Sequence, residues 1–454
     1  MTAPSEPAVP AAGARAEGSL VRAVGTWALA ASIVNITVGG GIFRVPAEMA
    51  IVLGAAAPIA YVVCAAAMAL IVLCIAEAGS RVALTGGPYA YVEVAFGPFV
   101  GFLAGVLLWL VGTFATAGVS TIFLGSLSGI VPAIGGRGAS AAVLAATFVV
   151  VCAINIRGVR QGARLNVVVT IAKLLPLLLL VAAGAAFVRP EYLAVESPPA
   201  TGEVARAAVV LIFAFAGIES ALVPSGEVRE PARTVPRAIF IAMAAITVLY
   251  IAVQVVVQGV LGARLADDAV RTAPLAAAAE IALGPWGRML LLVGAVVSTF
   301  GYLSGMTLAM PRALFAFARD GFLPRALAQV HPRWRTPWPA IVVQMAIVWA
   351  LAVTTQFMRL AVLANIATLL LYAGCCVAAW ELRRRGVRAA GATPFRVPAA
   401  GVVPVLACVV IAALLWATEV REWLVVTVVL AAAAAVFALT RDSRRRVATA
   451  PETP

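Results

Sequence analysis

The sequence predicts an all-α membrane protein with about twelve transmembrane helices. Of its 454 residues, 63% are hydrophobic and only 12% are charged, and the hydrophobic residues occur in long runs. A water-soluble domain carries roughly a quarter charged residues, far more than this chain. A helix that crosses a bilayer needs about 20 mostly apolar residues, and most of the runs are that long.

This length rule defines the expected segments. Their approximate limits are residues 24–53, 56–79, 97–130, 139–157, 165–188, 204–227, 237–262, 286–317, 338–356, 359–381, 399–418 and 422–440. We expect residues 1–20 to form a disordered N-terminus, residues 21–441 the membrane domain and residues 442–454 a polar tail. The N-terminus lacks the apolar core of a signal peptide.

The arginines predict the orientation of the bundle. Connections on one side carry clusters, the richest being residues 319–335 and 383–396, whereas most of those on the other side carry one or two. The positive-inside rule places the rich side, and with it both termini, in the cytoplasm of a cell (inner) membrane. Because the arginines lie between apolar runs, the net charge of +13 does not indicate nucleic-acid binding, and the expected partner is the lipid bilayer.

The first segment contains three successive glycines, Gly39, Gly40 and Gly41. Each costs about 1 kcal/mol in a helix interior relative to alanine. Irregular backbone at membrane depth persists only where protein shields it or where it lines a cavity. We therefore expect a broken helix, whose second half begins near Ile42 and directs its N-terminal amides at an anion such as a carboxylate. The alternative is close helix packing through small residues.

Two connections are expected to lie against the bundle rather than in free solution. Residues 85–91 are too glycine-rich for a plain helix and too apolar for a free loop. Residues 270–284 are amphipathic and are predicted to form a short helix along the surface.

Lys173 is the only lysine in the chain and lies within the fifth segment. A lysine can lose its proton when buried, whereas an arginine cannot, so its use here suggests a titratable or compact cation. The alternative is a side chain that extends to the interface. Arg44, in the first segment, precedes Glu48 by four residues and is expected to pair with it on one helix face.

The sixth segment contains a second interruption, in which Ala216 and Gly217 precede Ile218 and Glu219. A carboxylate at membrane depth costs about 2.5 kcal/mol or more unless it is paired, protonated or hydrated. Interruptions at corresponding positions of two halves indicate a transporter site between inverted repeats. The alternative role for Glu219 is structural, with the carboxylate bonded to a helix end or a neighbouring hydroxyl. A charged turn is expected to follow at residues 227–236.

No pattern in the chain indicates a cofactor. The six cysteines lie in or beside apolar segments without metal-binding spacing, and His331, the single histidine, lies in an expected loop. The cysteines are therefore interpreted as small apolar packing residues.

These motifs together resemble the amino acid–polyamine–organocation superfamily over about residues 20–440. The similarity is greatest to the branch that holds L-type amino acid transporters and bacterial arginine/agmatine-type exchangers. The motifs that carry it are Gly39–Phe43 with Pro46, Gly86–Tyr89, Phe213–Glu219 with Pro231 and Pro236, Ser298–Gly301 and Arg319–Pro324. The resemblance implies a five-plus-five inverted repeat, about residues 22–188 and 204–381, with peripheral helices at about 399–440.

The resemblance also implies roles for individual residues. It places a substrate carboxylate on amides near Gly40 and Gly41, and the substrate amino group on carbonyls near Thr37, Phe213 and Ala216. The expected substrate-binding residues are Thr37, Gly39, Gly40, Gly41, Phe213, Ala216, Gly217, Glu219 and Met306. Lys173 matches a lysine that replaces a sodium ion in proton-coupled members, near the hydroxyls of Ser298 and Thr299; these three are the expected coupling residues.

The expected function is secondary amino acid transport by alternating access, coupled to protons or to exchange. The alternatives are a cationic amino acid or polyamine antiporter, a sodium symporter, which the ammonium of Lys173 disfavours, an ion channel and an intramembrane enzyme. The sequence leaves open the substrate, the choice between symport and exchange, and the oligomeric state.

Overall fold

The computed structural model describes residues 24–82, 84, 86–157, 163–223, 228–388 and 393–440, with side chains left out for residues 163–172. The expected disordered N-terminus, residues 1–20, and the polar tail, residues 442–454, lie outside the described residues. Throughout the described ranges the chain is helical, with loops and turns between the helices and one isolated bridge between Val24 and Val228. The predicted all-α fold is confirmed.

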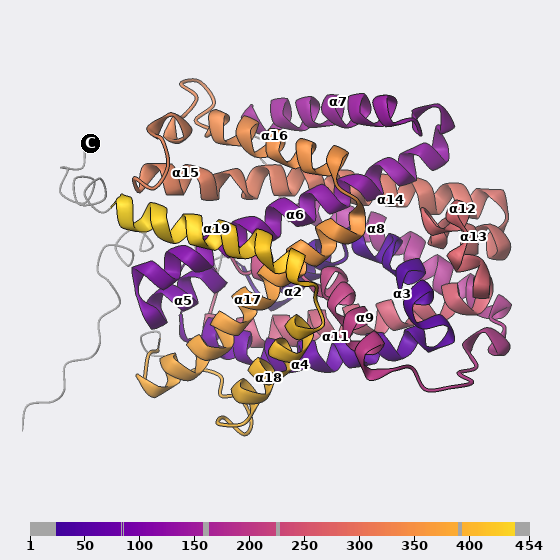
Figure 1. Cartoon of the computed structure of the whole chain (residues 1–454), viewed down its shortest axis with the longest axis horizontal. Coiled ribbons are helices and arrows are strands. Elements are labelled where there is room, and N and C mark those ends of the chain that lie inside the picture. The colour runs from indigo at the N-terminus through magenta and orange to yellow at the C-terminus, as the bar shows by residue number, and fades with distance from the viewer. Residues whose placement is uncertain are drawn as a thin grey trace, which may run out of the picture.

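The helices run back and forth along the long axis of the molecule (Figure 1). The α-helices are α2 (Thr26–Thr37), α3 (Val45–Leu53), α4 (Ala57–Arg81), α5 (Pro88–Phe96), α6 (Pro98–Ile130), α7 (Arg137–Ile156), α8 (Ala163–Gly184), α9 (Thr201–Phe215), α10 (Ile218–Ala221), α11 (Pro231–Leu261), α12 (Asp268–Arg271), α13 (Pro274–Leu283), α14 (Pro285–Ala309), α15 (Pro311–Arg319), α16 (Trp338–Thr354), α17 (Phe357–Arg384), α18 (Val403–Trp416) and α19 (Val420–Leu439). Short 3₁₀ turns are η1 (Gly41–Phe43), η2 (Gly54–Ala56), η3 (Pro132–Ile134), η4 (Ala185–Phe187), η5 (Pro190–Leu193), η7 (Gly262–Ala266) and η8 (Arg325–Ala328).

The predicted segments correspond to these helices. Within the described ranges, eight helical stretches are long and apolar enough to cross a membrane. Shorter apolar helices account for the other segments, namely α2, α8, α16 and α18. We call the ends of the bundle by their arginines: α4, α15 and α17 finish at the arginine-rich end, and α12 and α13 lie at the arginine-poor end (Figure 1).

Both predicted helix breaks are present. Helix α2 stops at Thr37, η1 starts at Gly41, and α3 does not begin until Val45. Helix α9 stops at Phe215, and the four-residue α10 follows after Ala216 and Gly217. The break at Gly217 requires glycine because its φ is +132°, in a region that side chains rarely adopt.

Three connections differ from the expectation. In the first connection, Gly86 and Gly87 precede a helix, α5, that already begins at Pro88. This start is explained by the preference for proline in the first turn of a helix. For the same reason α11 begins at Pro231, so the expected charged turn is shorter than residues 227–236. The expected surface helix is two helices, α12 and α13, and α13 buries Leu275 and neighbouring alanines in the bundle.

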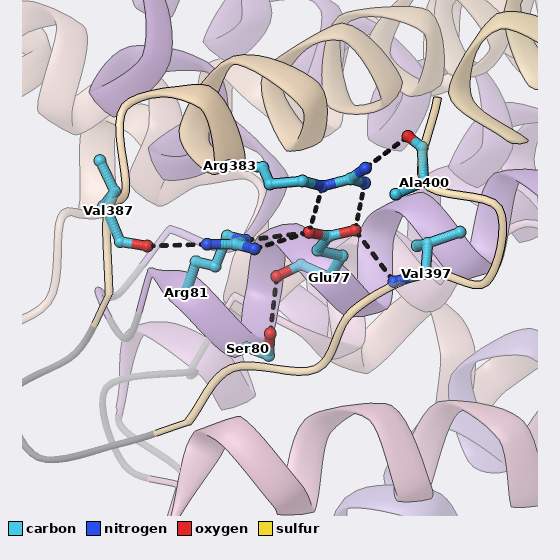
Figure 2. Close-up of polar contacts among 7 residues, drawn as sticks. All are labelled: Glu77, Ser80, Arg81, Arg383, Val387, Val397 and Ala400. Atoms are coloured by element: carbon cyan, nitrogen blue, oxygen red, sulfur yellow. Dashed lines mark hydrogen bonds and ion pairs between the residues drawn. The ribbon is translucent and has the colours of Figure 1, made fainter. Parts of the chain in front are cut away.

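A buried ion cluster fastens the arginine-rich end of the bundle (Figure 2). Glu77 of α4 is fully buried and accepts hydrogen bonds from Arg81, on its own helix, and from Arg383 at the end of α17. The backbone N–H of Val397 donates to the same carboxylate at 3.2 Å. The two guanidinium groups also donate to carbonyls of the connection before α18, at Val387 and Ala400. The Glu77 carboxylate therefore joins α4 and α17 to the loop between α17 and α18.

Candidate functional site

The two helix breaks face one small cavity in the middle of the bundle. Its lining comes from α2, η1, α6, the α9–α10 break, α14 and α17, and comprises Ile36, Thr37, Gly39, Gly40, Gly41, Val111, Ala115, Val119, Phe213, Ala216, Gly217, Glu219, Ser220, Tyr302, Met306, Ala364, Asn365 and Thr368. All nine residues expected to bind substrate are among them. The cavity volume is about 30 Å³, roughly the space of one water molecule, so an amino acid requires it to open.

The irregular backbone leaves helix ends directed at this cavity. The first N–H groups of a helix and its last carbonyls lack intrahelical partners, and they carry about half a positive and half a negative charge respectively. The N-terminus of η1, at Gly41, and the C-termini of α2, at Thr37, and α9, at Phe215, all meet here. The cavity therefore has backbone N–H groups on one part of its wall and backbone carbonyls on another.

The two breaks are packed closely together. A Cβ atom added at Gly217 would lie 2.9 Å from Oγ1 and 3.0 Å from Cα of Thr37, so only glycine allows this approach. The buried hydroxyl of Tyr250, on α11, bonds to the carbonyls of Thr37 and Ala214 at 3.0 Å each. Tyr250 thus joins the C-terminal ends of both half-helices, α2 and α9.

Glu219 adopts the structural role that the sequence left as an alternative. Its Oε2 accepts a hydrogen bond from the backbone N–H of Gly217 at 2.9 Å and from the hydroxyl of Tyr372, on α17, at 2.6 Å. None of the ion pairs in the described part of the chain includes Glu219. The carboxylate holds the second break in place while its residue still lines the cavity.

Aromatic side chains cover the glycines of the first break. A Cβ atom at Gly41 would lie 3.1 Å from Cα of Ala214 and 3.2 Å from the Phe213 ring. The Phe213 ring also packs edge-on against Phe357, with centroids 5.4 Å apart. A Cβ atom at Gly39 would lie 3.3 Å from the ring of Tyr302. The rings of Phe213 and Tyr302 therefore leave little room for a side chain at Gly41 or Gly39.

Sequence reasoning identified Met306 of α14 but missed Tyr302 of the same helix and the contribution of α17. Tyr302 lies one turn before Met306 on α14, and Asn365, Thr368 and Tyr372 follow one face of α17 at helical spacing. Asn365 donates to the carbonyl of Val209 at 2.7 Å, whereas its buried Oδ1 has no hydrogen-bond partner in the described structure. Polar residues at this spacing in an apolar segment were the signal that could have identified this face.

Lys173 joins α8 to the first break, as predicted. Its Nζ donates to the carbonyls of Asn35 and, at 3.0 Å, Val38, and the side chain is buried. Lys173 does not bond to Ser298, which the resemblance places near it, because the buried Ser298 hydroxyl has no hydrogen-bond partner within the described residues. The Thr299 hydroxyl donates to the carbonyl of Ala295 on its own helix. Because α2 ends at Thr37, the carbonyls of Asn35 and Val38 are available to accept hydrogen bonds from the lysine.

A second ion cluster lies beyond the first break, toward the arginine-poor end. Arg44 Nε and Glu48 Oε1 are 3.1 Å apart, which confirms the predicted pair. Arg271 of α12 adds two further bonds to the Glu48 carboxylate, at 3.2 and 2.8 Å. The half-helix α3 is therefore fastened to the connection between α11 and α14.

Comparison with known proteins agrees with this geometry. Residues 24–439 match the model of a family described as amino acid permease. The chain belongs to this family. It is similar to the branched-chain amino acid permease BcaP of Bacillus subtilis, with 28% identity over 91% of this chain and 93% of that protein. It is also similar to the serine/threonine exchanger SteT of Bacillus subtilis, with 30% identity over 69% of this chain and 72% of that protein.

A further relative extends the range of substrates among similar proteins. The L-lysine transport protein of Corynebacterium glutamicum is 31% identical over 71% of this chain and 66% of that protein. The family and the apolar helices identify the permease as a multi-pass membrane protein that acts as a secondary amino acid transporter.

Proposed function

We propose that this permease carries neutral amino acids by alternating access, with the backbone groups of the substrate held on the two helix breaks. The observation that carries the proposal is that both breaks line the same cavity. The amides at the start of η1, near Gly40 and Gly41, suit the carboxylate. The carbonyls near Thr37, Phe213 and Ala216 suit the amino group. Backbone groups at helix ends can bind the carboxylate and the amino group without a charged side chain.

The rest of the cavity favours a neutral side chain. Its walls are mainly aliphatic, from Val111, Ala115, Val119 and Met306, and its single charged residue is Glu219. Because Glu219 already accepts bonds from Gly217 and Tyr372, a cationic substrate would have to displace one of them. The free Oδ1 of Asn365 offers an acceptor to a hydroxyl-bearing side chain.

Transport of a cationic amino acid is the second candidate. It is supported by the similarity to the L-lysine transport protein and by a carboxylate in the cavity wall that has no cationic partner among the described residues. Transport of a neutral amino acid is preferred because the Glu219 side chain is buried and already accepts a short hydrogen bond from Tyr372, which a cationic substrate would have to compete with.

Coupling is proposed to reside in Lys173. Its ammonium donates hydrogen bonds to backbone carbonyl oxygens at the first break. Carbonyls of unwound helices are also the ligands that bind sodium in related transporter architectures. A sodium ion beside it would be repelled, so protons or a counter-substrate are the proposed coupling partners. A transport step that moves α2 would remove the acceptors of the ammonium and thereby favour loss of its proton.

The two ion clusters are the proposed closures of the central cavity. Glu77 and Arg383 join α4 and α17 at the arginine-rich end, which we propose faces the cytoplasm. Glu48 and Arg271 join α3 and α12 at the opposite end. Alternating access then requires one cluster to separate while the other stays joined.

Counterflow in proteoliposomes tests the proposal. Vesicles filled with unlabelled L-leucine, L-threonine or L-lysine are diluted into a trace of the same labelled amino acid. We expect transient accumulation of labelled leucine or threonine that exceeds that of lysine. A dominant lysine signal would favour the cationic candidate. Labelled amino acid that only equilibrates, without an overshoot, would indicate a channel instead of a carrier.

A further inference from the structure

A second, larger cavity lies at the arginine-poor end of the bundle. Its lining comes from the end of α6, from η7, α12 and α13, and from the start of α14, and comprises Gly125, Ser128, Gly129, Arg264, Ala269, Val270, Thr272, Ala273, Ala277, Glu280, Ile281 and Arg288. Its volume is about 510 Å³, within the range of about 300–1,000 Å³ that small-molecule sites occupy. None of the residues discussed so far as substrate contacts belongs to it.

The lining combines charges of both signs with an apolar surface. Arg288 donates to Glu280 at 2.9 Å, whereas Arg264 takes part in none of the ion pairs of the described chain. Two guanidinium groups and one carboxylate give the lining a net positive charge, carried by the exposed side chain of Arg264, to which an anionic group can bind. Val270 and Ile281, with the alanines between them, provide an apolar surface beside these charges. A carboxylate, an ammonium and an apolar side chain match the three parts.

This outer cavity and the central one share two helices. On α6, Val119 lines the central cavity and Gly125 lines the outer one, which corresponds to about 9 Å along the helix axis. On α14, Tyr302 lines the central cavity and Arg288 the outer one. A molecule in the outer cavity is thus held close to the central site without touching it.

The outer cavity is also connected to the broken first helix. Val270 and Thr272 of the α12 region line it, and Arg271 between them binds Glu48 of α3. A ligand that contacts both sides of Arg271 contacts the segment that fastens α3.

We propose that the outer cavity is a second amino acid site, which takes the zwitterion of an amino acid with an apolar side chain. The carboxylate binds Arg264, the ammonium binds Oε1 of Glu280 while Arg288 keeps its bond to Oε2, and the side chain lies on Val270 and Ile281. This inference rests on the proposed function only in that amino acids are the cargo. The outer site needs no transport to be detected, so the two proposals fail separately.

Protection of an introduced cysteine tests the site in the purified full-length protein. Thr272 is exposed and lines the outer cavity, whereas the native cysteines are buried or half-buried. The rate at which a charged thiol reagent modifies Thr272→Cys is measured with and without millimolar L-leucine. Thr272→Cys is placed in a protein that also carries Gly41→Leu, a substitution that we expect to block the central site. The Gly41→Leu protein without Thr272→Cys measures the background modification of the native cysteines. We expect leucine to slow the modification.

Two further variants assign the contacts. Arg264→Gln should raise the leucine concentration for half-protection about tenfold, as expected for one lost charge-assisted bond. The matched control Arg137→Gln alters an exposed arginine of α7 that does not line the cavity, and should change nothing. Glu280→Gln should weaken protection by leucine but not by 4-methylpentanoate, which lacks the ammonium.

The outcomes separate the proposals. Absence of protection by leucine, or protection that is unchanged in Arg264→Gln, would overturn the outer site even if counterflow is normal. Equal protection by leucine and 4-methylpentanoate in all variants would reduce the site to one for carboxylates and overturn the zwitterion assignment. Absence of counterflow together with normal protection would instead count against the proposed transport function.

Discussion

The Nζ atom of Lys173 lies 3.0 Å from the carbonyl oxygen of Val38, a residue 135 positions earlier in the chain. Val38 is the residue at which α2 loses helical geometry, so its carbonyl is available to an outside donor. A cation on α8 thereby stabilises an irregular backbone that would otherwise leave polar groups unsatisfied at membrane depth. The same contact makes the lysine sensitive to any movement of the broken helix.

Replacement of Lys173 should remove the dependence of transport on external pH. We expect wild-type uptake to vary with pH and to be unaffected when choline replaces sodium, since we propose that the ammonium takes the place of a sodium ion. Lys173→Ala should lose the pH dependence, retain part of any exchange activity and gain no sodium requirement. Uptake against pH in both salts measures this. Sodium-driven uptake in the wild type, or an unaltered pH profile in the mutant, would refute the coupling role.

Gly41→Leu should abolish uptake while the protein still reaches the membrane. A side chain at this position blocks the amides of η1, and its Cβ atom also meets Ala214 and Phe213 at 3.1–3.2 Å. Gly305→Leu is the matched control, because a Cβ atom at Gly305 of α14 has no neighbour within 4 Å. Uptake is normalised to the amount of protein in the membrane. Normal substrate affinity in Gly41→Leu would show that the substrate binds elsewhere.

Tyr372→Phe should destabilise the second helix break and lower transport. The hydroxyl of Tyr372 is one of two donors to Oε2 of Glu219, and removing a bond to a buried charged group costs about 1.5–3 kcal/mol. The matched control is Tyr61→Phe, since the buried hydroxyl of Tyr61 has no hydrogen-bond partner in the described structure. Thermal unfolding of the two variants in detergent should differ clearly. Equal melting temperatures would show that the Tyr372 bond contributes little.

Glu77→Gln should weaken the arginine-rich end of the bundle. It leaves the guanidinium groups of Arg81 and Arg383 without their carboxylate, and loss of one partner from a buried ion pair costs about 3–5 kcal/mol. Glu230→Gln is the control, because Glu230 pairs with Arg233 at 4.0 Å with both side chains exposed, and such pairs contribute at most about 1 kcal/mol.

Melting temperature and access of a thiol reagent to the central cavity measure the effect of Glu77→Gln. We expect a lower melting temperature and faster modification of a cysteine introduced at Ala216, from the arginine-rich side. A variant with reduced stability but unchanged access would mean that the cluster fastens the fold without closing the cavity.

Several features of the site were predicted because their signals are local in the sequence. Three adjacent glycines interrupt the first apolar run, and a glycine followed closely by a carboxylate interrupts the sixth, and both patterns are costly in a helix at membrane depth. A single lysine among arginines and the Arg44–Glu48 spacing are equally local. Helix α5 was not predicted and the start of α11 was placed too late, because Pro88 and Pro231 were interpreted as parts of connections although proline is favoured in the first turn of a helix.

Apolar run length and backbone chemistry are properties of neighbouring residues, so they were enough to predict the all-α membrane fold and the two helix breaks, whereas the list of cavity residues came from the family resemblance. The contacts of these residues depend on how the helices pack together. Tyr372 binds Glu219 across 153 positions and Arg383 binds Glu77 across 306. Such pairings depend on which helix faces are packed together, and an apolar segment with few polar residues gives almost no indication of its facing partner.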